Sequence, residues 1–203
     1  MIAIITGDII NSENYSSSVW MPLLKNIFKK YGKQPKDWDI YRGDEFQLKI
    51  APEKALEVAI HIKAVLKTVK NLDVRLGIGL GEETYSGQRI TEANGSAYQR
   101  SGRTFETLRE QKIRLALASG NPDQDQVLNL LIRLGLHFMD DWSTVSAEAV
   151  AWALEHPEHS QKEVAKHFKI QQSAVSQRQK RARLDLVLEL LHYYRQTLTD
   201  TMI

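Results

Sequence analysis

The 203-residue sequence predicts an α+β protein in which a mixed sheet packed with helices is followed by an all-helical segment. The first 118 residues alternate apolar strand and helix patterns in the order β-α-β-β-α-β-α-β. A Gly-Asn-Pro-Asp break follows at 120–123, and every later apolar pattern has the helical period. We therefore expect one domain at 1–120 and a second at 121–203.

Composition is typical of a folded protein that needs no membrane. Hydrophobic residues make up 42% and charged residues 26% of the chain. Cysteine is absent, which excludes disulfides and thiolate metal sites. No apolar run approaches the roughly 20 residues that span a bilayer. The N-terminal residues lack the basic lead-in of a signal peptide, so we expect a cytoplasmic protein.

The first half of the chain supplies most of the expected sheet. Ile2–Ile5 is a continuous apolar run typical of a central strand. A helix follows from the caps at 16–18 to Tyr31, and its Pro22 fits only in a first turn. Residues 37–42 and 45–50 predict a hairpin, and residues 55–69 predict a second helix.

Residues 74–81 form the clearest strand pattern. Its apolar side chains share one face, whereas Gly77, Gly79 and Gly81 lie on the other. A bare strand face means that a helix, a backbone segment or a ligand approaches closely, and the pattern does not choose among them. A helix at 92–110 and a strand at 112–118 complete the unit. In a split β-α-β arrangement the first strand and the hairpin lie side by side in mid-sheet.

Two acidic motifs meet in this topology. Thr6-Gly7-Asp8 closes the first apolar run, and Arg42-Gly43-Asp44-Glu45-Phe46 forms the hairpin tip, where Gly43 can take a positive φ. Alone, a Gly-Asp-Glu sequence more often forms a solvated turn. Beside Asp8, however, its carboxylates suit a hard divalent cation such as Mg²⁺ or Mn²⁺.

The C-terminal segment is basic and resembles a helix-turn-helix. Residues 160–195 hold eight Lys/Arg and three acids, a net charge of +5. Ser160 and Glu163 predict a capping box, Ile170 fills the turn and Val175 packs the second helix on the first. Lys169 stands where glycine is common, so it must bear a strained conformation or alter the turn. Further helices are expected at 127–136, 146–155 and up to about 198.

The second helix of this motif carries side chains suited to duplex DNA. Uncharged hydrogen-bonding groups at its start suit base edges, and basic groups later in the helix suit phosphates. The predicted DNA-binding residues are Gln171, Gln172, Ser173, Ser176, Gln177, Arg178, Lys180, Arg181 and Arg183. The alternative is a basic solvated helix in a dimerisation domain. An apolar stripe from Leu186 to Leu198 covers the motif or forms the seam of a homodimer.

Together these motifs resemble the SatD family of bacterial proteins. The resemblance is carried by residues 6–12, 42–46, 75–79 and 95–103 and by the helix-turn-helix. More distantly, the N-terminal part resembles the ferredoxin-like palm of class III nucleotidyl cyclases and GGDEF diguanylate cyclases. There, one acid closes the first strand and a Gly-Asp hairpin supplies the second.

The resemblance implies roles for individual residues. Asp8 and Asp44 correspond to the metal-binding carboxylates, Ile9 lends its carbonyl, and Glu45 is an auxiliary acid. Nucleotide-binding roles are implied for Gly43, Arg100 and Arg103. Arg42 stands where the GGDEF signature has its first glycine, and its side chain would crowd a bound purine.

We therefore expect a DNA-binding transcriptional regulator whose palm-like domain binds a divalent metal and a nucleotide, such as a nucleoside triphosphate, as a signal. The alternative is an active metal-dependent nucleotidyl cyclase or nucleotidyltransferase that the helix-turn-helix tethers to DNA. The regulator is preferred because its DNA-reading features are local and agree with one another, whereas catalysis requires further substrate contacts. No residue is assigned a catalytic role.

Overall fold

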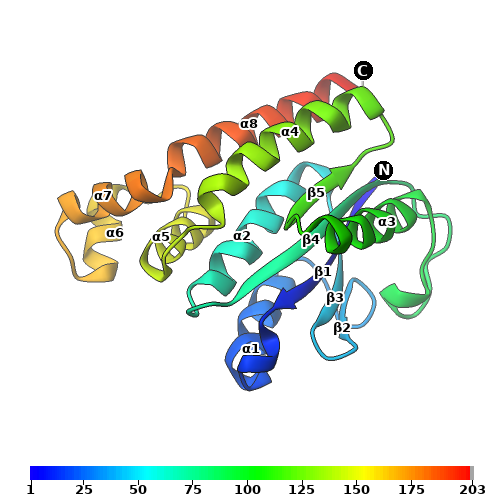
Figure 1. The fold of residues 1–203 in the computed structure, drawn as a ribbon, viewed down its shortest axis with the longest axis horizontal. Coiled ribbons are helices and arrows are strands. Elements are labelled where there is room, and N and C mark those ends of the chain that lie inside the picture. Colours follow the sequence, from blue (N-terminus) through cyan, green and yellow to red (C-terminus); the bar gives the residue numbers. More distant parts are fainter. Residues whose placement is uncertain (202–203) are drawn as a thin grey trace.

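The computed structural model describes residues 1–201, which form a five-stranded mixed sheet and eight α-helices (Figure 1). The strands are β1 (Ile2–Ile10), β2 (Trp38–Tyr41), β3 (Glu45–Ile50), β4 (Asp73–Gly81) and β5 (Leu115–Ala118). The helices are α1 (Ser17–Phe28), α2 (Ala55–Lys67), α3 (Ser96–Gln111), α4 (Pro122–Met139), α5 (Thr144–Glu155), α6 (Gln161–Phe168), α7 (Gln172–Ala182) and α8 (Leu184–Thr201). Within the described chain, no helix is both long and apolar enough to cross a bilayer.

The strand order is β2-β3-β1-β4-β5, and β4 and β5 are parallel while the other neighbours are antiparallel. The predicted contact between the first strand and the hairpin is confirmed, because Gly7 of β1 lies opposite Phe46 of β3. β1 is longer than expected and continues through Asp8 to Ile10, which pairs with Asp73. Asp8 therefore lies within a strand, opposite Arg75, rather than after one.

Helices cover both faces of the sheet. The apolar faces of β1, β3 and β4 join α1 and α2 in the main hydrophobic core, and α3 packs on the opposite face of β4. A Cβ atom on Gly79 would lie 2.2 Å from the Ala97 carbonyl oxygen, and one on Gly77 would lie 2.7 Å from the Phe105 nitrogen. The bare glycine face of β4 thus receives the backbone of a helix and not a ligand.

Helix α1 begins where its cap predicts but differs in one detail. Ser16 caps the helix through the backbone N–H of Ser18. Pro22 is the sixth helical residue, so the expectation that it lies in the first turn is wrong. Proline at this depth removes one backbone hydrogen bond. Burial of Trp20, Leu24 and their neighbours against the core compensates for that loss.

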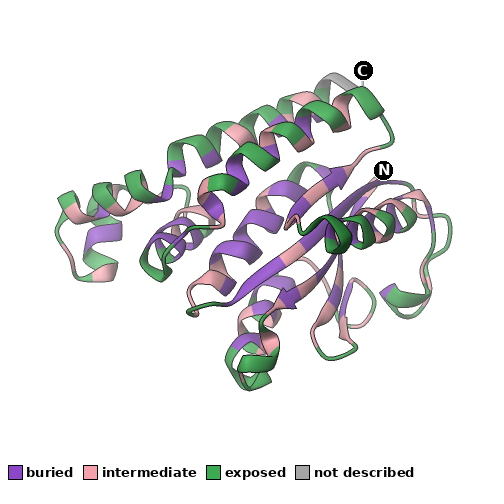
Figure 2. Ribbon diagram, in the orientation of Figure 1, coloured by how far each residue is buried: buried purple, intermediate pink, exposed green. Residues whose placement is uncertain are grey.

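The chain changes from alternating strands and helices to helices alone at the predicted boundary, but the hydrophobic core continues across it. α4 starts at Pro122 with Asn121 as its N-cap. α4 packs against β5, α5 packs against α2, and buried residues of α4, α5 and α8 belong to the same core as the sheet. Among the C-terminal helices of the described chain, α6 and α7 share a separate small cluster, formed by Val164, Ala165 and Val175, although Ala182 of α7 belongs to the main core. Figure 2 shows buried positions concentrated on the strands and α2, and further buried positions on α4 and α8 among exposed ones.

Most of the apolar stripe of α8 lies in neither of the two places expected from sequence. Val187, Leu191, Tyr194 and Leu198 are buried in the main core and not in the α6–α7 cluster. The hydroxyl of Tyr194 donates to the Pro52 carbonyl at 2.7 Å, just before α2. The stripe therefore fastens α8 to the sheet domain.

Lys63 of α2 is a buried charge at the junction between the sheet and the C-terminal helices. Its ammonium lies 2.7 Å from Asp73 at the start of β4 and 2.7 Å from Asp140 at the end of α4. Arg114 reaches both acids, at 3.5 Å and 2.8 Å. Lys67 adds a hydrogen bond to the Asp140 carbonyl at 2.7 Å. The network thus joins α2, β4, the approach to β5 and α4.

We predict that Lys63→Ala lowers the free energy of unfolding by about 3–5 kcal/mol, because Asp73 then keeps a buried charge without its closest partner. Lys54→Ala, which removes a half-exposed partner of Glu57, should change it by no more than about 1 kcal/mol. Urea unfolding of both variants measures the difference. Equal effects would show that the buried network does not hold the two parts together.

Candidate functional site

A polar cleft opens on the same face of the sheet as α3, beside that helix and over the strands that it leaves uncovered. Phe46, Leu48 and Ile50 of β3 point into the core, so Glu45 and Gln47 point the other way. The cleft has a volume of about 520 Å³. Its walls come from β1, the β2–β3 hairpin and α3, and include Thr6, Tyr41, Arg42, Glu45, Gln47, Phe105, Glu106 and Arg109.

Asp8 lies beside this cleft, on β1. Arg75 of β4 donates a 2.9 Å hydrogen bond to Oδ2 of Asp8, whereas Oδ1 is buried and has no hydrogen-bond partner among the described residues. Burial raises the pKa of Asp8; Arg75 and Arg109 oppose this rise, and the charges of Asp44 and Glu45 add to it. A further cation would therefore stabilise the ionised form of Asp8.

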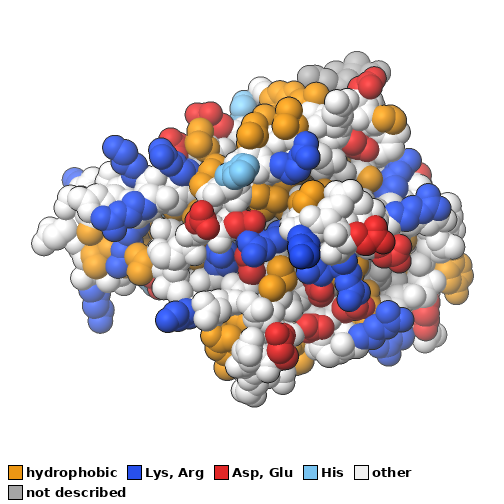
Figure 3. Space-filling model, in the orientation of Figure 1, with side chains coloured by type: hydrophobic (Ala, Val, Ile, Leu, Met, Phe, Trp, Pro, Cys, Tyr) orange, Lys and Arg blue, Asp and Glu red, His pale blue; other side chains and the backbone are white. Residues whose placement is uncertain are grey.

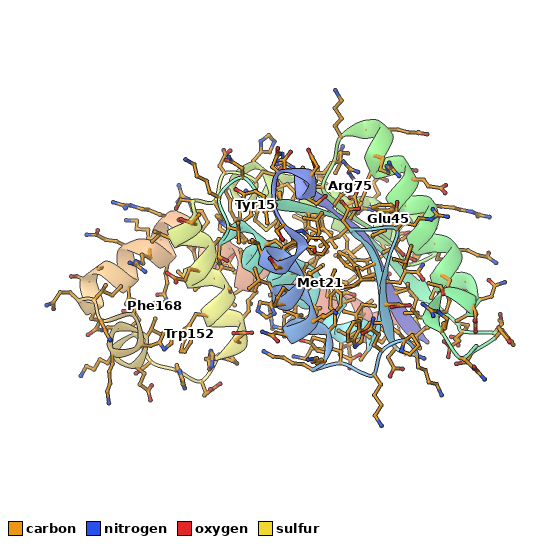
Figure 4. The ribbon with its side chains drawn as sticks, turned by 90° about the horizontal axis from the view of Figure 1, so that it is seen from below. Tyr15, Met21, Glu45, Arg75, Trp152 and Phe168 are labelled. Atoms are coloured by element: carbon orange, nitrogen blue, oxygen red, sulfur yellow. The ribbon has the colours of Figure 1, made fainter. Side chains whose placement is uncertain are left out.

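The hairpin tip brings further acids to the same end of the sheet. Residues 42–44 connect the paired Tyr41 and Glu45, and Gly43 has the predicted positive φ, 91°. The hydroxyl of Ser12, two residues after β1, donates to the carboxylate of Asp44. Glu45 lies 3.8 Å from Arg109. Figure 4 shows Glu45 and Arg75 on neighbouring parts of this end.

Asp8, Asp44 and Glu45 are therefore gathered as the strand order predicts, and Ile9 follows Asp8 in β1. Their metal-binding role stays a prediction. Within residues 1–201, no three Asp, Glu or His side chains are arranged to hold a metal ion together. A cation here would need main-chain, hydroxyl, water or phosphate oxygens in addition to carboxylates.

Arg100 and Arg103 are not brought to the acids. Arg100 donates to the carbonyls of Leu80 and Ser119, at 2.6 and 2.8 Å. Leu80 pairs with Ala3, so Arg100 lies at the opposite end of the sheet from Asp8. Arg103 lines a different cavity of about 350 Å³, between α3, β5 and α4.

Arg109 is the α3 arginine that reaches the cleft, and sequence reasoning missed it. The residues of α3 that line the cleft are Gly102, Phe105, Glu106 and Arg109. Their spacing of three and four residues is that of one helical face. The sequence feature that could have identified Arg109 is the glycine face of β4. A helix that packs on this face through Ser101 and Phe105 must turn Arg109 toward the hairpin.

Hydrogen bonds between side chains fix the floor of the cleft, and the sequence analysis did not predict them. Thr6 and Ser101 hydroxyls lie 3.0 Å apart, and the Gln47 amide donates to Thr6 at 3.4 Å. Burial, with a further contribution from Glu45, raises the pKa of Tyr41 to about 12. Its phenol therefore stays neutral and can donate a hydrogen bond at physiological pH. The cleft combines these neutral donors and acceptors with two arginines, Arg42 and Arg109, and with two acids, Glu45 and Glu106.

The second candidate surface is the α6–α7 pair, at the left in Figure 1. Ser160 and Glu163 form the predicted capping box of α6. Lys169 ends α6 with φ of 53°, so it adopts the strained left-handed conformation that the sequence offered as one alternative. Only residues 169–171 separate the two helices.

Most predicted DNA-binding residues of α7 are exposed on one side of the helix. Val175 and Ala182 are buried toward the protein. The exposed residues are Gln171, Gln172, Ser173, Ser176, Gln177, Lys180, Arg181 and Arg183. Arg178 differs, because it lies 3.3 Å from Glu148 of α5 and 5.6 Å above the Phe168 ring. It braces α7 against α5 and α6.

Helix α5 connects the α6–α7 pair to the remaining protein through aromatic contacts. The Trp152 ring stacks between His156 and His167, with centroid distances of 3.9 and 3.5 Å. Trp152 also packs edge-on against Phe168. Figure 4 places Trp152 and Phe168 far from Glu45 and Arg75. The two candidate surfaces are therefore at separate ends of the molecule.

The environment of Asp8 predicts a pH-dependent stability difference. Because its folded-state pKa is raised, wild type loses stability from this group as pH rises above the ordinary value of 3.8. Asp8→Asn lacks this loss, so it should be the more stable protein near pH 7, by a margin that shrinks toward acidic pH. Urea unfolding across this range measures the margin, with exposed Glu110→Gln as the control. A less stable Asp8→Asn at neutral pH would show that the Arg75 ion pair outweighs burial.

Comparison with known proteins identifies the family. No curated protein matches the chain. The model of the SatD family matches residues 1–197 and so includes the cleft, α6, α7 and most of α8. With nearly the whole length matched, the chain belongs to the SatD family.

Proposed function

We propose that this protein is a DNA-binding transcriptional regulator, and that its cleft binds a nucleotide together with a divalent metal as the signal. The observation that carries the DNA part is the outward side of α7, where uncharged hydrogen-bonding side chains precede basic ones. In this proposal α6 and α7 form a helix-turn-helix, and α7 enters the major groove.

The chemistry of α7 fits a division of labour on duplex DNA. Gln172, Ser173, Ser176 and Gln177 can exchange hydrogen bonds with base edges. Lys180 and the arginines beyond it can neutralise phosphates. The buried contacts of Val175 and the Arg178–Glu148 ion pair keep the helix fixed on its support, which limits the ordering cost of binding.

The DNA proposal predicts a defined loss of salt dependence. Lys180→Ala/Arg181→Ala should weaken duplex binding and reduce the slope of log K against log salt by about two, because each phosphate contact contributes about 0.9. Lys29→Ala/Lys36→Ala removes the same charge from exposed positions of the sheet domain and should leave both quantities unchanged. Fluorescence anisotropy over a salt series is the measurement. Equal losses in both variants would indicate nonspecific attraction and contradict the assignment of α7.

The nucleotide proposal rests on the cleft's mixture of groups. Arg109 and Arg42 provide cations for phosphates at its α3 and hairpin sides. Gln47 and Thr6 offer an amide and a hydroxyl on the floor, and Tyr41 adds a neutral phenol and an aromatic ring. Such a site matches the polar and planar surfaces of a nucleoside triphosphate.

The residues also fit a magnesium or manganese ion. Asp8 has a buried carboxylate oxygen without a hydrogen bond, and Asp44 lies at the same end. Mg²⁺ is commonly held by one or two carboxylates, with water and substrate phosphates completing its shell. The bound metal would neutralise phosphate charge. Asp8 and Asp44 would hold it, while Arg75 keeps Asp8 oriented.

Substitution of two arginines of α3, one inside the cleft and one outside it, tests the proposed nucleotide binding. Arg109→Ala should weaken Mg²⁺–triphosphate binding by about 10-fold or more, because it removes a charge-assisted hydrogen bond. Arg103→Ala, six residues earlier and in a different cavity, should leave it unchanged. Titration calorimetry with each of the common nucleoside triphosphates gives the affinities. No binding, or a loss confined to Arg103→Ala, would overturn this assignment.

The same samples separate a regulator from the alternative enzyme. The paired acids Asp8 and Asp44 are what favours that alternative. Release of pyrophosphate by wild type, abolished by both Asp8→Ala and Asp44→Ala, would establish a nucleotidyl cyclase or nucleotidyltransferase. Binding without pyrophosphate release supports a sensory cleft.

A further inference from the structure

Exposed apolar side chains are concentrated on two neighbouring helices. Of the ten large hydrophobic side chains exposed within the described chain, six lie on α4 and α8. They include Leu130 and Leu134 of α4, with 48% and 56% of their surface exposed. Figure 3 shows hydrophobic side chains gathered along these helices at the top of the molecule. Such clustering differs from the scattered apolar residues of an ordinary surface.

These side chains follow the spacing of helix-packing seams. On α4, the exposed positions Val127, Leu130 and Leu134 are separated by three and four residues. Asp123 precedes them by four residues and His137 follows by three, and both are exposed. Alternating steps of three and four residues place all five on one stripe, as at the core positions of a coiled coil.

Helix α8 carries a second stripe beside the first. Leu186, Leu190 and Tyr193 have the same four-and-three spacing. The two helices run antiparallel, since Gln124 near the start of α4 donates to the Thr197 carbonyl near the end of α8. A Cβ on Gly135 of α4 would lie 3.7 Å from Leu190, so the stripes adjoin. Together they form the open half of a four-helix bundle.

We propose that a second copy of this chain covers this α4–α8 face, so that two copies complete a four-helix bundle. The α4 helices of the two copies lie antiparallel, and the two-fold axis passes near Leu130. Most of the stripe predicted from the sequence of α8 is buried within one chain, so this interface uses only its outer members, Leu186 and Leu190, together with Tyr193.

The charge pattern of α4 selects a second copy in this orientation. Reversal about Leu130 places Val127 opposite Leu134 of the other copy and Asp123 opposite its His137. A parallel pairing would instead bring Asp123 against Asp123. The stripe is therefore self-complementary under a two-fold axis, as an isologous interface requires.

The surface area of the α4–α8 face indicates how stable the dimer should be. An 18-residue helix is about 27 Å long, and two packed helices are about 8–10 Å apart. The face then covers about 500–600 Å² per copy, or about 1,000–1,200 Å² in all, at the lower limit for a stable interface. We therefore expect a dimer that dissociates on dilution.

Sedimentation equilibrium of the full chain tests this interface. Wild type should approach twice the 23.2 kDa chain mass with rising concentration, and Leu130→Glu should remain at the single-chain mass. Leu188→Glu is the matched control, because Leu188 is also exposed but lies two residues from Leu186, on the other side of α8. Its dimer should persist. A monomeric wild type at every concentration, or a dimer lost only in Leu188→Glu, would overturn the proposal.

Cysteine cross-linking tests the orientation, since the chain has no cysteine of its own. Leu130→Cys should form a disulfide-linked dimer under mild oxidation, because residues at a two-fold axis approach their own copies. Asp123→Cys alone should not, but a mixture with His137→Cys should cross-link. Self-linking by Asp123→Cys with no mixed product would contradict the antiparallel arrangement. Circular dichroism verifies that each variant is folded.

Discussion

The buried charge of Lys63 is the constraint on which the joint between sheet and helices depends. A lone ammonium in the core would be very costly, and the surrounding Asp73 and Asp140 are what make its burial tolerable. Those acids come from β4 and from the end of α4. The position of the C-terminal helices is thus coupled to the sheet by charge satisfaction as well as by their shared apolar core.

Strand β4 links this junction to the cleft. Asp73 holds Lys63, and two residues later Arg75 holds Asp8. Farther along the same strand, Gly77 and Gly79 admit α3 so closely that no side chain fits between them. Because α3 sits over β4, it leaves β2 and β3 uncovered on that face, and the polar cleft lies in the space that remains.

The α6–α7 pair and the outer sides of α4 and α8 lie outside the network formed by Lys63 and β4, and other contacts determine their structure. The α6–α7 pair has a small core of its own and rests on α5 through ring stacking around Trp152. Its polar side faces away from the sheet. The outer sides of α4 and α8 retain exposed apolar residues although their inner sides are well packed. The surface proposed for DNA and the surface proposed for a second copy therefore share no residues.

The sequence by itself determined the order of elements, the tight hairpin at Gly43, the capping box at Ser160 and the meeting of Asp8 with Asp44, because these depend on local conformation and strand order. Tertiary structure decided which arginine faces the cleft. Arg100, Arg103 and Arg109 are all on α3, and only the rotation fixed by packing on the glycine strand distinguishes them. It also decided that the C-terminal helices share the sheet's core, since the contacts of Lys63 join segments far apart in sequence, which no local pattern encodes.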